Sequence, residues 1–533
     1  MKKGFTLIEL LGVIIILGVI SLLVVPTMNK LLKDAKQKTY DRQVLIIEDS
    51  ARKWGMNHID ELNETTTTFV SVQDLMNEGL IEQDELIDPR DSKVMNGCTI
   101  IEYIPSKNKY KYDYINNNCA MVSDPNVLRP ISPEYACFTF DEKTETLTSY
   151  DGTCSKDVNI PQKIIKGDLV YNIRNISTGA FYNKQLTSVI IPEGVLEIGD
   201  GSNGAFRGNY ITNLVIPSSM TKIGTYAFYG NNITNLDLSK ATNLRTIGNY
   251  AFYSNNITNL DLSKATNLEV IDGYSFYSND ISTLNLTGLT NLGYIGSNAF
   301  RNNSISNVDL TSLTNLTNLS SAAFSTNNIT SAKVGARVSY IGDGPFSNNP
   351  NLETLTVDAT NLTFKSVNNA IYTKDGTRLI QGTKGMSNNI EPTVTNIYDN
   401  SFEGMGLTSV TLPSSVTYIS YEAFLNNAIT SLDLSSLTNL YTISSYSFQN
   451  NNISSLNLTG LTNLRSIGTW AFRNNQLSSV TIPASVISIG SYAFNQVSTY
   501  PWSSVTIEYD ASNPLTRFNS SWTSIGWPSN LMP

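Results

Sequence analysis

The sequence is poor in the residues on which most catalytic and metal-binding sites depend. Its 533 residues include one histidine, His58, and four cysteines, and charged residues make up only 15%. A Ser-His-Asp triad would have to use His58, and the chain has no P-loop, G-x-S-x-G or H-E-x-x-H motif. The net charge of −9 also argues against nucleic acid, which proteins bind through Lys and Arg. The sequence therefore predicts a non-enzyme with no catalytic residues, cofactor, metal site or nucleic-acid partner.

The chain opens with a long apolar run. Phe5 to Val25 carries a single charge, Glu9, and about 20 apolar residues can span a bilayer as a helix. Lys2 and Lys3 place the N-terminus of such a helix in the cytoplasm. A carboxylate inside the membrane costs on the order of 3 kcal/mol, so Glu9 is expected to have a partner.

The six residues from Gly4 to Glu9, GFTLIE, resemble the class III signal of type IV prepilins and pseudopilins. The resemblance implies that a prepilin peptidase removes residues 1–4 by cutting between Gly4 and Phe5, and then methylates the new amine of Phe5. It also implies that Glu9 pairs with the Phe5 amine of a neighbouring subunit, as a charge-assisted bond in apolar surroundings. The plainer reading is a simple membrane anchor that happens to contain a glutamate.

After the predicted membrane and filament-core helix (residues 5–25), apolar residues recur at three-to-four spacing as far as Trp54. This periodicity predicts an amphipathic stalk helix over residues 26–62, with His58 solvated near its end. Residues 63–122 are expected to form a small α+β head with a short helix and a strand hairpin. This stretch resembles, more loosely, the C-terminal part of Gram-positive pseudopilin-like subunits.

The cysteines flank two predicted hairpins. In an extracytoplasmic chain an even cysteine count favours disulfides over metal ligands, and four cysteines allow three connectivities. Cys98 and Cys119 bracket one hairpin and Cys137 and Cys154 a second, which favours these two local pairs. A proline-containing linker (123–134) is expected to precede the second hairpin, whose residues 135–160 would cap the array that follows.

Residues 161–500 repeat with a period of 22 or 24. Phe228, Phe252 and Phe276 are each separated by 24 residues. A period of this size with an L-x-x-L-x-L core is the signature of leucine-rich repeats. More narrowly, the A-F-x-x-N/C-x-I-x-x-L-x-L/I-P unit resembles the bacterial surface-protein class typified by BspA. Period-two alternation then points Leu260 and Leu262 into a solenoid of short parallel strands.

Two segments depart from the repeat. Residues 347–401 are expected to form an irregular unit within one continuous solenoid, with a hairpin turning at Asp375-Gly376. Residues 501–533 hold three tryptophans and are expected to form a C-terminal cap. The fold class is thus an α+β pilin-like part, with a long N-terminal helix and a small β head, followed by a β-rich leucine-rich-repeat solenoid.

Outward strand residues form the candidate ligand face of this solenoid. They are Asn235, Asp237, Asn259, Asp261, Asn307, Asp309, Asp433 and Asn457. The recurring aspartates also suggest a calcium ladder, but Asn285 and Asn457 interrupt it and no D-x-D-x-D-G loop exists. A solvated strand face is therefore preferred.

These resemblances imply a bacterial cell-surface subunit that displays the repeats for adhesion to a host or neighbouring-cell protein or glycan. The precursor would be a single-pass protein of the cytoplasmic membrane, and the mature subunit would join other pilins through its N-terminal helix in an extracellular filament. A bulky solenoid would crowd a filament, so a minor or tip subunit is preferred over the major pilin. The alternatives are a pseudopilin of a secretion or DNA-uptake machine and a simple membrane-anchored repeat receptor.

Overall fold

The computed structural model describes residues 35–58, 68–82, 97–104, 109–115, 137–166, 169–386 and 389–494, together with 62, 86, 88–89, 95 and 506–507. Gly4, Phe5, Glu9 and Cys119, the predicted membrane helix 5–25, the linker 123–134 and most of the predicted cap 501–533 lie outside these ranges. Within them, no helix is both long and apolar enough to cross a membrane. The chain divides into two compact units, Met1–Pro133 with Ile165–Tyr171, and Glu134–Ile164 with Asn172–Pro533.

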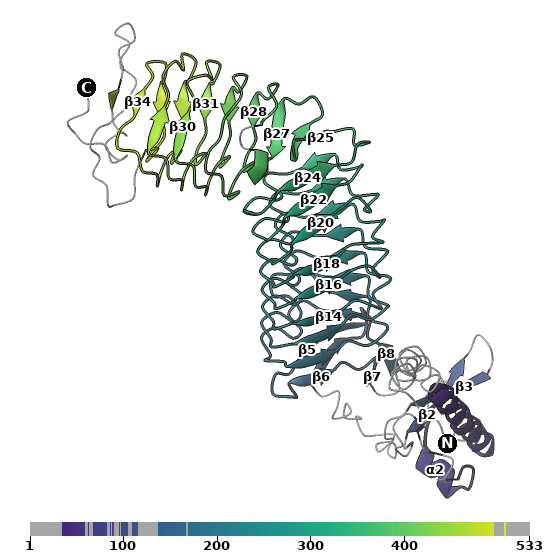
Figure 1. The fold of residues 1–533 in the computed structure, drawn as a ribbon. Helices are drawn as coiled ribbons and strands as arrows, with labels where there is room; N and C mark the ends of the chain where they lie inside the picture. Colours follow the sequence, from purple (N-terminus) through teal and green to yellow (C-terminus); the bar gives the residue numbers. More distant parts are fainter. Residues whose placement is uncertain are drawn as a thin grey trace, which may run out of the picture. The chain divides into compact units, whose positions relative to one another are not determined.

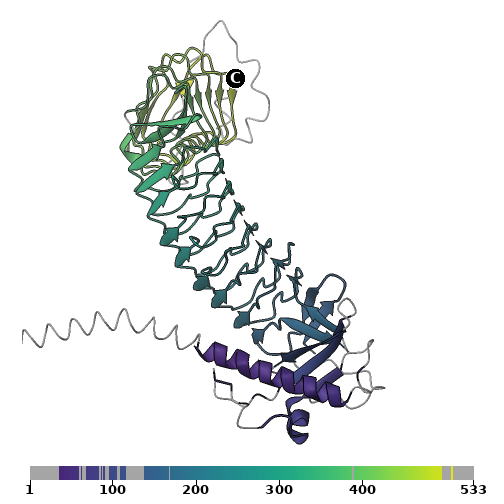
Figure 2. The same cartoon turned by 90° about the vertical axis from the view of Figure 1, so that its right-hand side faces the viewer.

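The first unit contains a helix that packs on a small antiparallel sheet (Figure 2). The helix covers residues 35–57, and the other elements are β1 (Thr68–Ser71), α2 (Val72–Asn77), β2 (Cys98–Ile104) and β3 (Lys109–Ile115). The sheet has the order β1-β2-β3. Ile47, Ala51 and Trp54 of the helix are buried with Val70 and Ile101 of the sheet in one apolar cluster. The apolar face expected from the helical spacing is therefore the face that this helix buries.

Two expectations for the end of this helix are wrong. The helix ends at residue 57 rather than at Leu62, which is not helical and packs beside the apolar cluster. His58 is not fully solvated: its side chain is 26% exposed, its ring stacks on Trp54 with centroids 4.3 Å apart, and its Nε2 lies 3.3 Å from Glu78 Oε1. The Trp54 indole also donates to Glu78 at 2.8 Å. Packing against Trp54 and Glu78 thus decides where this part of the chain lies.

Parallel strands of the second unit stack into the solenoid that the repeats predicted, which confirms that part of the fold (Figure 1). Ile198, Ile223, Ile247 and Ile271 lie side by side in register, one repeat apart. Because every second residue of a strand faces the same way, this register lines one buried column with β-branched side chains. Leu260 and Leu262 are fully buried while Asn259 and Asp261 are exposed, as the alternation predicted.

The strands between residues 137 and 360 form one long sheet and several short ones. The ten-stranded sheet holds β4 (Phe138–Asp141), β5 (Thr146–Tyr150), β9 (Asn175–Ile176), β11 (Glu197–Ile198), β13 (Lys222–Ile223), β15 (Thr246–Ile247), β17 (Val270–Ile271), β19 (Tyr294–Ile295), β21 (Asn318–Leu319) and β23 (Tyr340–Ile341). The short sheets pair β6 (Asp157–Asn159) with β10 (Ser188–Ile190), β7 (Lys163–Lys166) with β8 (Leu169–Asn172), β12 (Asn213–Val215) with β14 (Asn235–Asp237), β16 (Asn259–Asp261) with β18 (Thr283–Asn285), and β20 (Asn307–Asp309) with β22 (Ser331–Val334) and β24 (Thr354–Val357).

The later strands form a second long sheet. It holds β25 (Phe364–Val367), β26 (Ala370–Thr373), β27 (Arg378–Gln381), β28 (Asn396–Ile397), β29 (Tyr418–Ile419), β31 (Thr442–Ile443), β33 (Ser466–Ile467) and β35 (Ser488–Ile489). Beside it, β30 (Ser431–Asp433) pairs with β32 (Ser455–Asn457), and β34 (Thr481–Ile482) with β36 (Thr506–Ile507). A single turn of 3₁₀ helix, Lys384–Met386, precedes β28.

Stacked phenylalanine rings fill the centre of the coils. From Phe181 to Phe346 successive ring centroids are 4.7–5.8 Å apart, and a second stack runs from Phe402 to Phe494. All of these rings are buried. The phenylalanine that marks each repeat in the sequence is therefore the side chain that each coil adds to the core.

A buried or half-buried asparagine three residues after most of these phenylalanines binds the backbone of neighbouring coils. The Asn255 amide donates to the carbonyls of Phe228 and Phe252 at 3.0 and 3.1 Å, and its oxygen accepts the N–H of Ile233 at 3.1 Å. Equivalent bonds recur at Asn231, Asn279, Asn303, Asn327, Asn349, Asn427, Asn451 and Asn475. These amides satisfy backbone groups that the short strands leave unpaired in the core.

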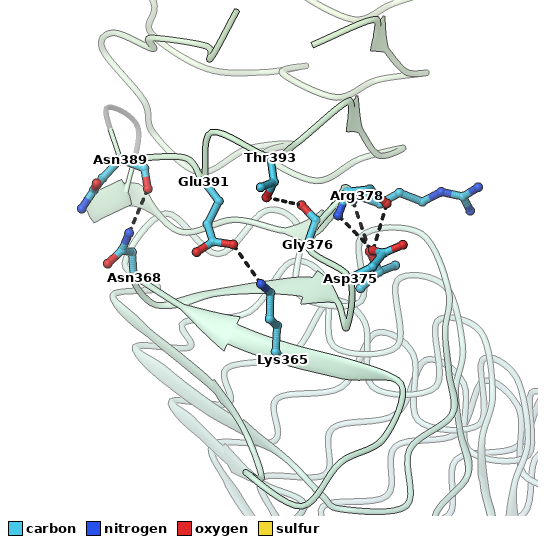
Figure 3. A network of polar contacts seen from close by, with 10 residues as sticks. Lys365, Asn368, Asp375, Gly376, Arg378, Asn389, Glu391 and Thr393 are labelled. Atoms are coloured by element: carbon cyan, nitrogen blue, oxygen red, sulfur yellow. Dashed lines mark hydrogen bonds and ion pairs between the residues drawn. The ribbon is translucent and has the colours of Figure 1, made fainter. Parts of the chain in front are cut away.

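The irregular unit is held together by polar contacts (Figure 3). β25, β26 and β27 are antiparallel, and β27 then pairs in parallel with β28. The turn at Asp375-Gly376 connects β26 to β27, with Gly376 at φ +78°. The contacts shown in Figure 3 include Lys365 Nζ to Glu391 Oε2 at 3.0 Å, Asn368 Nδ2 to the Asn389 carbonyl at 3.1 Å, and Thr393 Oγ1 to the Gly376 carbonyl at 3.0 Å. They hold the inserted hairpin against the segment that leads into β28.

Candidate functional site

The predicted ligand-face residues lie on the short strands β14, β16, β20, β30 and β32. Asn235 and Asn259 are exposed at the first position of their strands, and Asp261 is exposed at the third. The parallel register brings Asp433 of β30 beside Asn457 of β32, and Asp261 beside Asn285 of β18. The structure thus groups these residues into two outward columns, formed by the first and third strand positions and separated by a middle residue that is buried or half-buried.

The aspartates at the third strand position, which make up the second column, close turns. Sequence reasoning missed this role. Oδ1 of Asp237, Asp261, Asp309 and Asp433 accepts the backbone N–H two residues later, at 2.8–3.0 Å. This arrangement is an Asx turn, in which the aspartate side chain takes the place of a backbone carbonyl as the hydrogen-bond acceptor. Hydrogen bonds from the hydroxyl and N–H of Ser239 lower the pKa of Asp237, and those from Ser435 lower the pKa of Asp433. The D-x-S/T spacing in the repeat was the available signal.

Neighbouring coils are also bridged along this column. Asn285 donates to Asp261 at 2.9 Å, Asn457 donates to Asp433 at 2.9 Å, and Lys333 lies 3.2 Å from Asp309. The interrupting asparagines are thus hydrogen-bond partners of the aspartates. Across the described ranges, no group of three or more His, Cys, Asp or Glu side chains is placed to hold a metal ion.

A second outward feature lies at the turns that flank the phenylalanine stack, and the sequence analysis did not single it out. We call it the aromatic edge, and it consists of two rows of tyrosines on three consecutive coils: Tyr226, Tyr250 and Tyr274 in one row, and Tyr229, Tyr253 and Tyr277 in the other. Rings within a row are stacked with centroids 4.6–4.8 Å apart. Rings of the same coil meet across the rows at 5.6 Å, tilted by 43–57°. The 24-residue recurrence of both tyrosines was visible in the sequence.

An arginine occupies each end of the second row. One repeat before Tyr229 stands Arg207, whose guanidinium lies 4.7 Å from the Tyr229 centroid and 5.2 Å from that of Tyr226. One repeat after Tyr277 stands Arg301, which donates to Asn298 at 3.2 Å. A guanidinium over an aromatic face is a favourable cation–π contact.

The first tyrosine row occupies backbone positions that disfavour bulky residues. Tyr226, Tyr250 and Tyr274 have φ of 58°, 56° and 54°. A side chain with a Cβ costs roughly 1–2 kcal/mol in this left-handed region. The equivalent positions in adjacent coils hold Gly204 and Asn298, the residue types that tolerate it. Turn geometry therefore does not account for tyrosine at these three sites.

One predicted disulfide is present at the start of the solenoid. Cys137 and Cys154 are bonded, with their Cα atoms 6.1 Å apart, and the bridge closes the β4–β5 hairpin. Cys98 is also disulfide-bonded, and its predicted partner Cys119 lies outside the described residues. The described part of the chain has no free cysteine.

Comparison with protein families assigns the repeats. The family described as "BspA type Leucine rich repeat region" matches in six copies, over residues 174–294, 266–374 and 381–500. The chain belongs to the BspA-type leucine-rich-repeat family. A separate family, "Prokaryotic N-terminal methylation motif", matches residues 1–25. No curated protein matches the chain.

Several solved structures are similar to the BspA-type array. A leucine rich cell surface protein from Faecalibacterium prausnitzii shares 20% identity over 73% of this chain and 95% of that chain, with a TM-score of 0.40. The pneumococcal vaccine antigen PcpA shares 18% sequence identity over 68% of this chain and 76% of that chain, with a TM-score of 0.34. A leucine-rich repeat protein from Bacteroides ovatus shares 18% sequence identity over 73% of this chain and 100% of that chain, with a TM-score of 0.32. Because these TM-scores are below 0.5, the family assignment relies on the repeats themselves.

The BspA-type array thus offers two kinds of outward surface. The strand columns present amides, hydroxyls and carboxylates that are partly engaged in turns and coil-to-coil bonds. The aromatic edge presents tyrosine rings that stacking holds in place.

Proposed function

We propose that this protein is a pilin-like cell-surface subunit that displays its BspA-type solenoid for adhesion to a protein or glycan. The observation that carries the proposal is the presence, in one chain, of an N-terminal methylation motif and a surface-protein repeat array. Prepilin peptidase cleaves between Gly4 and Phe5 and methylates Phe5, and other pilins are the assembly partners through the N-terminal helix. Glu9 pairs with the Phe5 amine of a neighbour in this assembly.

The two units take different tasks in this proposal. The helix of the first unit (residues 35–57) serves as the pilin-like stalk, and its small sheet β1-β2-β3 serves as the head. The solenoid serves as the adhesive part. Its bulk favours a minor or tip subunit over the major pilin, and a membrane-spanning precursor precedes assembly.

The test of assembly is mass spectrometry of the mature N-terminus, from a sheared surface-filament fraction. We expect a peptide that begins at Phe5 with one added methyl group, recovered together with pilus subunits. A Gly4→Val variant should keep residues 1–4 and be lost from the filament fraction. A wild-type protein that retains Met1 and stays with membranes would instead be an anchored repeat receptor, and the pilin part of the proposal would fail.

The test of adhesion uses the strand face, with immobilised glycoproteins and cells as targets. Serine already occupies the first-column positions Ser431 and Ser455, so the double variant Asn235→Ser/Asn259→Ser changes the surface without a residue foreign to the array. We expect this variant to bind less than the wild type. The matched control Asn232→Ser/Asn256→Ser alters exposed turn asparagines of the same coils. Equal losses from both pairs would show that the strand columns are not the adhesive face.

A further inference from the structure

We propose that the aromatic edge binds a proline-rich segment in polyproline II conformation, flanked by acidic residues, on a partner protein. The six tyrosines from Tyr226 to Tyr277 line the surface, and Arg207 and Arg301 mark its two ends. This site is separate from the strand face and goes beyond the function proposed above.

The composition of the edge is that of a protein-binding surface. Tyr and Arg dominate the energetics of protein interfaces, and rings that are already held lose little conformational entropy on binding. Here each ring is held by its neighbours, at 4.7 and 4.6 Å in the row of Tyr250 and at 4.8 Å on both sides of Tyr253. Tyr226, Tyr250 and Tyr274 also occupy backbone positions where tyrosine is unfavourable.

The spacing of the rings selects among extended ligands. From Tyr226 through Tyr250 to Tyr274 the two ring spacings of 4.7 and 4.6 Å together make about 9.3 Å. A polyproline II helix has three residues per turn and rises 3.1 Å per residue, so it presents the same face every 9.3 Å or so. An extended strand repeats about every 6.7 Å, which matches neither one spacing nor two. Successive turns of a polyproline helix therefore meet equivalent rings on alternate coils.

The hydrogen-bonding chemistry agrees with this ligand. A polyproline II backbone has no internal hydrogen bonds, so its carbonyls seek donors, and proline offers no N–H in return. The six tyrosine hydroxyls have no hydrogen-bond partner among the described residues. A tyrosine hydroxyl, with an ordinary pKa near 10, is a protonated donor at neutral pH. Burial raises the pKa of Tyr250 and of Tyr253 further. The tilted rings of the two rows form the aromatic lining on which proline-rich segments dock in other proteins.

Faces of aromatic rings also bind sugars, but here both faces of the inner rings Tyr250 and Tyr253 are covered. Each inner ring is sandwiched between the rings of the adjacent coils, which leaves its edge and hydroxyl exposed.

The charge at the two ends of the aromatic edge decides which residues flank the prolines of the ligand. Arg207 and Arg301 lie four coil steps apart, about 19 Å at the spacing of stacked strands. About six prolines cover that length, so acidic residues on both sides of them would meet the two guanidinium groups.

The experiment measures binding of a synthetic peptide, about six prolines flanked by two glutamates on each side, to the purified full-length protein by calorimetry. We expect saturable binding that weakens when lysines replace the glutamates or when Gly-Ser repeats replace the prolines. The variant Tyr229→Phe/Tyr253→Phe/Tyr277→Phe keeps the stacked rings and removes three donors. It should weaken binding by about tenfold or more with an unchanged unfolding temperature.

Two further variants complete the test. Arg301→Gln should weaken binding by a few fold and reduce its salt dependence. Tyr441→Phe alters a tyrosine that is 48% exposed outside the aromatic edge, and it should bind as the wild type does. The proposal is overturned by absence of saturable binding, by equal affinity for the Gly-Ser peptide, by a triple variant that binds normally, or by preference for a β-linked hexasaccharide. None of these outcomes depends on filament assembly, so the proposal can fail without the proposed function.

Discussion

Replacing Asn255 with alanine tests whether the buried asparagines hold the coils together. The Asn255 amide donates to the carbonyls of Phe228 and Phe252, and its oxygen accepts the N–H of Ile233. After the substitution each carbonyl keeps another amide donor, from Asn231 at Phe228 and from Asn279 at Phe252. The Ile233 N–H, in contrast, loses the Asn255 oxygen as its acceptor and gains no replacement.

These differences determine how much Asn255→Ala should destabilise the solenoid. An orphaned buried N–H costs about 1–3 kcal/mol, and each lost bond to a carbonyl that keeps another donor costs about 0.5–1 kcal/mol. The expected destabilisation is therefore about 2–5 kcal/mol. Repeat arrays need not unfold in one step, so a local measurement is preferable to a single melting curve. Amide hydrogen exchange at Phe252, whose N–H donates to the Ser275 carbonyl at 2.8 Å, should accelerate by at least about 30-fold.

Two variants show whether the reasoning is right. Asn243 is exposed and donates one bond, to the Ser218 carbonyl at 3.0 Å, so Asn243→Ala should change exchange by less than about fivefold. Asn255→Asp preserves the volume but points an acceptor at two carbonyls, and it should destabilise more at pH 7 than at pH 4, where protonation restores one donor. If Asn255→Ala and Asn243→Ala had equal effects, the buried asparagines would not carry the stability assigned to them.

Three further predictions concern the core, the cap and the irregular unit. Phe276→Ala should destabilise the solenoid by about 3–5 kcal/mol in urea unfolding, while Phe276→Leu should cost clearly less, and equal costs would contradict close packing of the rings. Cys137→Ser with Cys154→Ser should cost about 3 kcal/mol, lost equally when the wild type is reduced. Burial, and next the charge of Asp343, raise the pKa of Asp399 above its usual 3.8. The folded state thus binds the extra proton, and stability falls as pH rises from 3.8 through the raised pKa. Asp399→Asn should exceed the wild type in stability at pH 7 and match it below pH 3.8, and a constant difference would refute the assignment.

The regular part of the fold was predictable because the local sequence pattern of each repeat determines the structure of its coil. Alternation at Leu260 and Leu262, and the recurrence of Phe252 every 24 residues, are local patterns that every coil satisfies in the same way. The disulfide between Cys137 and Cys154 is local too, since its cysteines flank one hairpin. Such features need no knowledge of distant contacts, and the structure confirms them.

The remaining features depend on contacts that only the folded chain creates. Tyr229 and Tyr253 stack at 4.8 Å because the rise of one coil brings residues 24 apart side by side. His58 is only partly exposed because it packs against Trp54 and Glu78, although Glu78 lies twenty positions further along the chain. Asp433 was predicted only as an outward residue of the ligand face, and in the structure its turn and its neighbour Asn457 engage it. Periodicity determines which way a side chain points, whereas the neighbour it meets is set by the stacking of coils and by the packing of the core.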